Sequence, residues 1–130
     1  MKKPGIIAFD KIDNKEKCVF SIVNSAQIPF EIKRVFWIFG GDENRIAGEH
    51  SHKNSEQVIV ALQGKINIST ETKSGEKQNF ILDESGKALY IPALCWQKIE
   101  YIGKAALLCF SSSEYNPDDY IRTYKEFKEL

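Results

Sequence analysis

Short runs of β-branched and aromatic residues, separated by turn residues, recur along almost the whole chain and constrain the fold most. One of them, Lys65–Thr70, alternates apolar and polar residues, which is typical of a strand with one buried and one solvated face. Many short strands at this spacing predict an all-β protein, a sandwich or a barrel. The expected strands are Ile6–Phe9, Cys18–Val23, Ile32–Phe39, Val58–Gln63, Lys65–Glu71, Gln78–Leu82, Ala88–Ile91, Gln97–Ile102 and Ala105–Ser111.

The C-terminus has a different pattern. Asn116 is suited to cap a helix, and Pro117 is suited to its first position. The aromatic and apolar residues Tyr120, Ile121, Tyr124 and Phe127 then recur at helical spacing. We therefore expect one short amphipathic α-helix after Asn116.

Composition limits the class of protein. A chain of 130 residues without linker or repeat predicts a single domain spanning residues 1–130. Its 18 basic and 18 acidic residues balance, which disfavours nucleic-acid binding. No apolar run approaches the roughly 18 residues of a membrane span. The three widely spaced cysteines, Cys18, Cys95 and Cys109, predict no disulfide framework, and with no signal-like segment they indicate a reduced cytoplasmic protein.

The only two histidines, His50 and His52, stand one residue apart. On a strand, both imidazoles would point to the same face, and Glu56 would join them if the alternation continued. Two imidazoles and a carboxylate form either a facial triad for a metal ion or a site for moving protons. The residue pattern leaves both alternatives open.

The spacing of His50, His52 and Glu56 resembles the first motif of the cupin superfamily. The second motif begins well, with Gly86 and then Pro92, but Leu94 stands in place of its glycine and Gln97 in place of its last metal ligand. This resemblance implies a jelly-roll β-barrel with the histidines facing its interior. A neutral amide at position 97 disfavours a transition metal.

Four segments together resemble a smaller family, the cupin-type 3,4-ketoisomerases of dTDP-4-keto-6-deoxy-D-glucose. These segments are Ile28–Phe39, His50–Lys53 with Glu56 and Gln57, Tyr90–Pro92 with Trp96, and Asp119–Tyr124. The resemblance implies that the keto group moves from C4 to C3 through an enediol-like intermediate, without a cofactor or a metal. It implies that His50 is the base, that His52 orients substrate or shares the proton, and that Glu56 holds one histidine in the correct tautomer.

The same resemblance suggests which residues bind the substrate. Arg34 and Arg45 are candidates for diphosphate contacts, because guanidinium groups match phosphate oxygens. Tyr90 and Trp96 are candidates for stacking on the base or lining the sugar pocket. Arg122 is expected to pair with Asp118 or Asp119 at helical spacing.

Three departures from the family pattern concern the site. Phe36 replaces a tyrosine, Arg45 stands apart from Gly48, and Gln97 replaces a histidine or arginine close to the reacting carbons. They leave the configuration of the product open. Two alternatives therefore accompany the isomerase: a metal-dependent cupin enzyme that uses His50, His52 and Glu56, and a non-catalytic barrel that binds a nucleotide sugar.

The resemblance also concerns the protein's partners. It implies a homodimer that exchanges N-terminal strands. It further implies that the 3-keto product is aminated by another enzyme, giving a 3-amino-3,6-dideoxyhexose for surface glycans.

Overall fold

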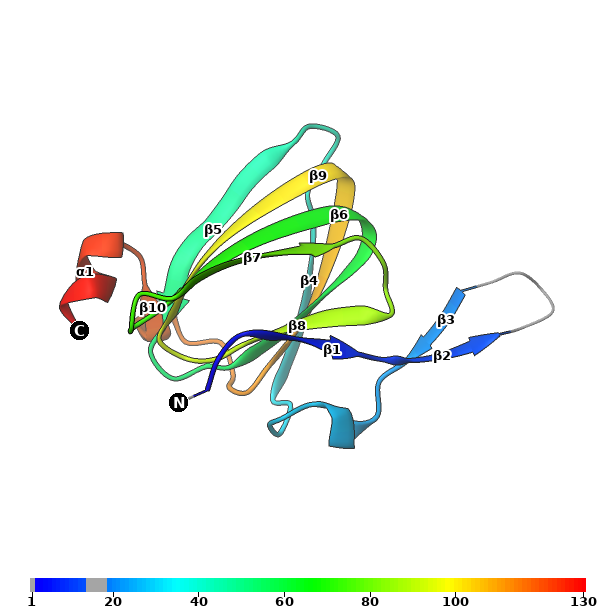
Figure 1. The fold of residues 1–130 in the computed structure, drawn as a ribbon, viewed down its shortest axis with the longest axis horizontal. Coiled ribbons are helices and arrows are strands. Elements are labelled where there is room, and N and C mark those ends of the chain that lie inside the picture. Colours follow the sequence, from blue (N-terminus) through cyan, green and yellow to red (C-terminus); the bar gives the residue numbers. More distant parts are fainter. Residues whose placement is uncertain (1, 14–18) are drawn as a thin grey trace.

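A computed structural model describes residues 2–13 and 19–130 of the chain. Its main feature is an antiparallel sheet that curls on itself, with a two-stranded hairpin extending to one side (Figure 1). This confirms the all-β fold class. The strands are β1 (Gly5–Ala8), β2 (Asp10–Asp13), β3 (Val19–Ile22), β4 (Arg34–Phe39), β5 (Arg45–His52), β6 (Gln57–Thr72), β7 (Lys77–Leu82), β8 (Lys87–Ile91), β9 (Cys95–Ser111) and β10 (Tyr120–Ile121).

Two long strands, β6 with 16 residues and β9 with 17, run through both halves of the curled sheet. The first part of β6 pairs with β8 and its second part with β7. In the same way, the first part of β9 pairs with β5 and its second part with β4. Each long strand therefore replaces two of the predicted strands.

Glycines at the bends of these two strands explain why the sequence predicts four short strands in place of two long ones. In the sequence, Gly64 and Gly103 suggest turns between separate strands. In the structure they have φ values of +70° and +61°, a conformation that glycine adopts readily. The ladder between β6 and β9 instead continues past them with shifts in register. A Cβ on Gly64 would lie 2.5 Å from the Gly103 carbonyl oxygen, so the two strands approach too closely for any side chain at this position.

The inner face of the curled sheet holds the main hydrophobic core, which includes Ile59, Ile68, Leu89, Ile99 and Leu107. A second cluster lies on the outer face, where Val58, Val60 and Tyr90 pack with Phe9 and Ile28. Cys95 and Cys109 are both free and buried, and burial raises the pKa of each thiol to about 12. Cys109 is fully buried, whereas Cys18 lies outside the described residues.

The sequence predictions omitted β2 and β5 and began the C-terminal helix too early. Strand β5 was missed, because its polar residues and Gly48 hide the alternation. At the C-terminus, Asn116 caps only the short 3₁₀ turn Pro117–Asp119, since its side chain accepts a hydrogen bond from the Asp118 amide. Tyr120 and Ile121 then form β10. The helix α1 (Tyr124–Glu129) begins later, after Thr123, whose hydroxyl accepts from the Glu126 amide. No helix in the described residues is long and apolar enough to cross a membrane.

Candidate active site

A β-bulge in β5 turns the histidines toward the interior of the barrel. Ala47 pairs with Ile99 and His50 pairs with Gln97, so three steps along β5 oppose two along β9. Without this extra residue, Glu49 would occupy the inward position. Gly48 lies in the bulge with φ +71°, and a Cβ there would contact both the His50 ring and Ile99 at 3.4 Å. Glycine therefore permits the bulge that places His50.

The two imidazoles contact each other edge to face. Their Nε2 atoms lie 3.2 Å apart, and the ring planes are 89° from parallel. Gln97 lies opposite His50 on β9, with its side-chain nitrogen 3.2 Å from the same His50 Nε2. The Gln97 amide also donates to Gln57 Oε1 at 2.9 Å. The structure thus brings the partly buried His50 together with the buried His52 and Gln97 in one polar cluster.

Asp119 contacts the other side of His52. The His52 Nδ1–H donates to Asp119 Oδ2 at 3.0 Å, and the side chains are 3% and 9% exposed. The same carboxylate accepts from the Ser55 hydroxyl at 2.6 Å and from the Asn54 amide at 2.7 Å. Asp119, not Glu56, is therefore the carboxylate that holds a histidine. In the sequence, only the position of Asp119 in the C-terminal motif could indicate this role, and there Asp119 is expected to pair with Arg122.

Tyr120 and two arginines surround the imidazole pair. The Tyr120 ring centroid lies 4.6 Å from that of His52 and 5.3 Å from that of His50. The Arg122 guanidinium lies 4.4 Å from the Tyr120 ring centroid, in place of the expected pairing with an aspartate. Arg34 contacts the Phe36 ring at 5.2 Å and donates to the Ser111 hydroxyl at 3.3 Å. Arg34 thus lies against Phe36 and close enough to His52 to act on it electrostatically.

These surroundings set the protonation of the site. Burial lowers the pKa of His50 to about 4, and His52 and Arg122 act in the same direction against the Gly48 carbonyl. Burial also lowers the pKa of His52, although Asp119 opposes this change. Burial opposes ionisation of Asp119, but hydrogen bonds from Ser55, Asn54 and His52 hold the pKa of that carboxyl below its usual range. At neutral pH the site therefore holds neutral imidazoles beside a carboxylate.

Glu56 belongs to a different group. Its carboxylate accepts hydrogen bonds from the Tyr90 hydroxyl and, at 2.9 Å, from Lys2 Nζ. The structure does not assemble the metal triad of His50, His52 and Glu56. Among residues 2–13 and 19–130, no group of three or more His, Cys, Asp or Glu side chains is arranged to hold a metal ion.

Two further candidates lie away from the imidazoles. Arg45 begins β5 and is exposed, about 15 Å along the strand from His50. Trp96 packs against the C-terminal helix, with ring centroids 5.7 Å from Tyr124 and 5.8 Å from Phe127. The structure therefore gives Trp96 a packing role and does not bring Arg45 to the histidines.

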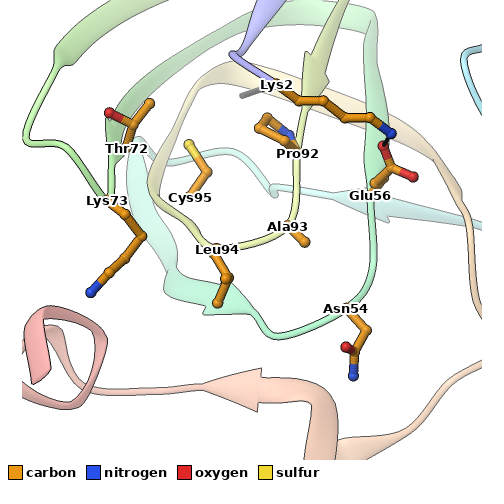
Figure 2. Close-up of a pocket in the computed structure, with 9 residues that line it drawn as sticks. All are labelled: Lys2, Asn54, Glu56, Thr72, Lys73, Pro92, Ala93, Leu94 and Cys95. Carbon is orange, nitrogen blue, oxygen red and sulfur yellow. Dashed lines mark hydrogen bonds and ion pairs between the residues drawn. The ribbon is translucent and has the colours of Figure 1, made fainter. Parts of the chain in front are cut away.

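An open cavity of about 500 Å³ lies beside the histidine segment. Figure 2 shows Asn54 and Glu56 on one side and the turn that contains Leu94 on the other. Neither imidazole lines it, and it adjoins the site through backbone contacts: the Asn54 amide donates to Asp119, and the Leu94 amide donates to the His52 carbonyl at 2.8 Å. Leu94 has φ +55°, the left-handed conformation that favours the glycine of the cupin motif.

Known proteins share both the sequence and this fold. The family model FdtA, described as WxcM-like, C-terminal, matches residues 2–130. The TDP-4-oxo-6-deoxy-α-D-glucose-3,4-oxoisomerase of Aneurinibacillus thermoaerophilus is 31% identical over 95% of this chain and 89% of its own.

Two solved structures extend the comparison. The TDP-fucose-3,4-ketoisomerase WlaRA of Campylobacter jejuni is 32% identical with a TM-score of 0.86, covering 98% of this chain and 95% of its own. A variant of the 3,4-ketoisomerase QdtA of Thermoanaerobacterium thermosaccharolyticum, in complex with TDP-4-keto-6-deoxyglucose, is 29% identical with a TM-score of 0.89, covering 99% and 94%. These matches confirm the predicted resemblance, and the chain belongs to the FdtA (WxcM-like, C-terminal) family.

Proposed function

We propose that this protein moves the keto group of TDP-4-keto-6-deoxy-D-glucose from C4 to C3, with His50 as the base. The enzyme class, a sugar-nucleotide 3,4-ketoisomerase, follows from the family and from relatives about 30% identical over nearly their whole length. The observation that carries the mechanism is the pair of neutral imidazoles, His52 buried and His50 partly buried, with Nε2 atoms 3.2 Å apart.

The reaction requires only the movement of a proton and of electrons within the sugar. The C4 ketone acidifies the C3 hydrogen, so a neutral imidazole can accept that proton while the C3–H electrons form an enediolate. Return of this proton to C4, together with transfer of the C3 hydroxyl proton to O4, leaves a carbonyl at C3 and a hydroxyl at C4, so atoms and electrons balance without a second reactant. A base with a pKa below the working pH is unprotonated and ready for this step.

Positive charge near the imidazoles suits an anionic substrate. Arg34 and Arg122 both act electrostatically on His52. Guanidinium groups so placed can bind a diphosphate or stabilise the oxygen that becomes negative in the enediolate. Gln97, which contacts His50, is the candidate for contact with the reacting carbons. Glu56 and Tyr90 remain candidates for the more distant part of the substrate.

The proposal is tested with the substrate in deuterated water. We expect wild-type protein to produce a 3-keto isomer that carries deuterium, and the NMR spectrum of the isolated sugar also gives the configuration at C4. His50→Asn should lower turnover by at least about 10³-fold while the circular dichroism of the protein stays unchanged. If this variant kept most of the activity, His50 would not be the base. Binding of the sugar by wild-type protein without deuterium exchange would identify a binding module instead.

The product suggests the next reaction. A carbonyl at C3 is the group that an aminating enzyme requires, so the 3-keto sugar is a precursor of a 3-amino-3,6-dideoxyhexose for surface glycans.

A homodimer is part of this proposal, and the outer face of the sheet supports it. Val35, Trp37 and Phe39 alternate along β4 and are 45%, 64% and 76% exposed. Strand β1 pairs with β8 of its own chain, so the element available for exchange is the β2–β3 hairpin that extends from the barrel (Figure 1). This hairpin exposes Val19 and Phe20, which suits packing against a second copy.

A further inference from the structure

The contact between Asp119 and His52 fixes where the His52 proton lies. Asp119 is a carboxylate with no proton to give, so the hydrogen bond of 3.0 Å requires a proton on His52 Nδ1. In the neutral ring the Nε2 atom is then an unprotonated acceptor. It points at His50 Nε2, which lies 3.2 Å away.

On the other side of the imidazole pair, Gln97 fixes the protonation of His50 Nε2. Gln97 gives one amide N–H to Gln57 Oε1 at 2.9 Å and directs its other N–H at His50 Nε2, 3.2 Å away. The Gly48 carbonyl acts on His50 in the direction that favours a protonated ring. Accepting from Gln97 requires a lone pair on His50 Nε2. His50 Nε2 therefore carries no proton of its own, and one added proton can replace the Gln97 contact and bridge the 3.2 Å between the two Nε2 atoms.

We propose that Asp119 is the positioning residue of the site: it keeps the His52 proton on Nδ1, so that His50 and His52 together accept one proton between their Nε2 atoms. The inference rests on the proposed function and deepens it. When the C3–H bond breaks, the proton that His50 takes is shared with His52, and the Asp119 carboxylate balances its charge. The proton is then held at the site for return to C4.

The charged and titratable groups around the pair are compatible with one added proton. His52 is influenced by Asp119 and by the guanidinium groups of Arg34 and Arg122, and His50 by His52 and Arg122. The two arginines oppose a second positive charge on the pair. One negative carboxylate and one shared proton give a neutral triad.

Asp119→Asn is the direct test, because asparagine has nearly the same shape. Its oxygen can still accept from the Asn54 amide, which leaves the NH₂ group facing His52 Nδ1. His52 must then accept at Nδ1 and carry its proton on Nε2, where it occupies the lone pair of His50. We expect kcat to fall about 10²- to 10³-fold, with KM changed less than about threefold. The ¹⁵N NMR shifts of His52 should report the change of tautomer.

Ser55→Ala is the matched control. This variant removes the 2.6 Å hydrogen bond to the same Asp119 oxygen. The carboxylate remains, so the His52 proton should stay on Nδ1. We expect it to lower stability modestly while kcat stays within about threefold. A change of tautomer in Asp119→Asn without a fall in kcat would overturn the inference. So would wild-type protein with the His52 proton on Nε2, a measurement that requires no variant.

Failure of the proposed function is separable from failure of this inference. Wild-type protein that leaves TDP-4-keto-6-deoxyglucose unchanged would contradict the function. The tautomer measured in the same sample would still show whether Asp119 places the His52 proton.

Discussion

His50 links the chemistry of single residues to the pH dependence of folding. Its pKa is about 4 in the folded protein and 6.5 in its unperturbed state. Between these values the unfolded chain binds more protons than the folded one. The neutral His50 ring therefore makes its full contribution to the free energy of unfolding above about pH 6.5, and this contribution is lost as the pH falls toward 4.

This gives a measurable difference between wild-type protein and His50→Asn. The full shift corresponds to about 3 kcal/mol, since one pKa unit is worth about 1.4 kcal/mol. We expect the free energy of unfolding of the wild type, relative to the variant, to decrease by about this amount between pH 7 and pH 4. Urea unfolding at several pH values measures it. Parallel curves for the two proteins would show that His50 is not held neutral by burial.

At the same scale, sequence patterns singled out the candidate base and its neighbour but not the residues that contact them. The spacing of His50 and His52 and the resemblance to a known family made both of them candidates. Asp119 was assigned to a different contact, because 67 residues separate it from His52 and only the pairing of β10 with β5 brings them together. Glu56 was expected beside the histidines, but β5 ends at His52 and the chain turns before β6, so the alternation does not continue.

Among the elements, the C-terminal helix secures the segment that carries Asp119 and Tyr120. With only 6 residues, α1 is too short to be stable alone. Its Phe127 is fully buried and packs against Trp96. The Tyr124 hydroxyl donates to the Glu71 carboxylate at 2.8 Å, and Lys128 Nζ lies 3.0 Å from the same oxygen. Packing and a partly buried ion pair therefore hold the helix on the barrel.

Phe127→Ala should show how much this packing contributes. Removal of a fully buried aromatic ring costs about 3–5 kcal/mol. We expect a loss of this size in urea unfolding and a lower kcat, because β10 lies just before the helix. Leu130→Ala is the control, since Leu130 is 58% exposed and should change stability by less than about 0.5 kcal/mol. A loss below about 1 kcal/mol in Phe127→Ala would show that the helix is not anchored by this ring.

The strand pattern predicted the elements unevenly, for a physical reason. Alternation identifies a strand with one wet face, as in Lys65–Thr70 of β6. It cannot distinguish a turn from a bend at a glycine, because both use the same backbone conformation, and Gly64 and Gly103 lie in bends. A bulge hides the alternation altogether, which is why β5 was missed.

For the whole molecule, the outer face of the sheet raises the question of assembly. Opposing residues in an antiparallel ladder share a face, so Trp37 lies beside Leu108, and Leu108 beside Val60. A groove of about 250 Å³ is lined by Leu108 and Val60 on one side and by Val19 of the hairpin on the other. An apolar face that its own chain covers only partly is suited to a second copy, which would add the sheet-on-sheet packing that one chain lacks.

Charge introduced on this face should therefore separate the subunits. We expect sedimentation velocity at micromolar concentration to give a dimer for wild-type protein and a monomer for the double variant Trp37→Lys/Phe39→Lys, because burying two ammonium groups in an apolar interface is strongly unfavourable. Ile81→Lys is the control: this residue is 54% exposed on β7, away from β4, and the variant should remain a dimer. A wild-type monomer would contradict the proposed dimer, and a dimer in all three proteins would place the interface on another face.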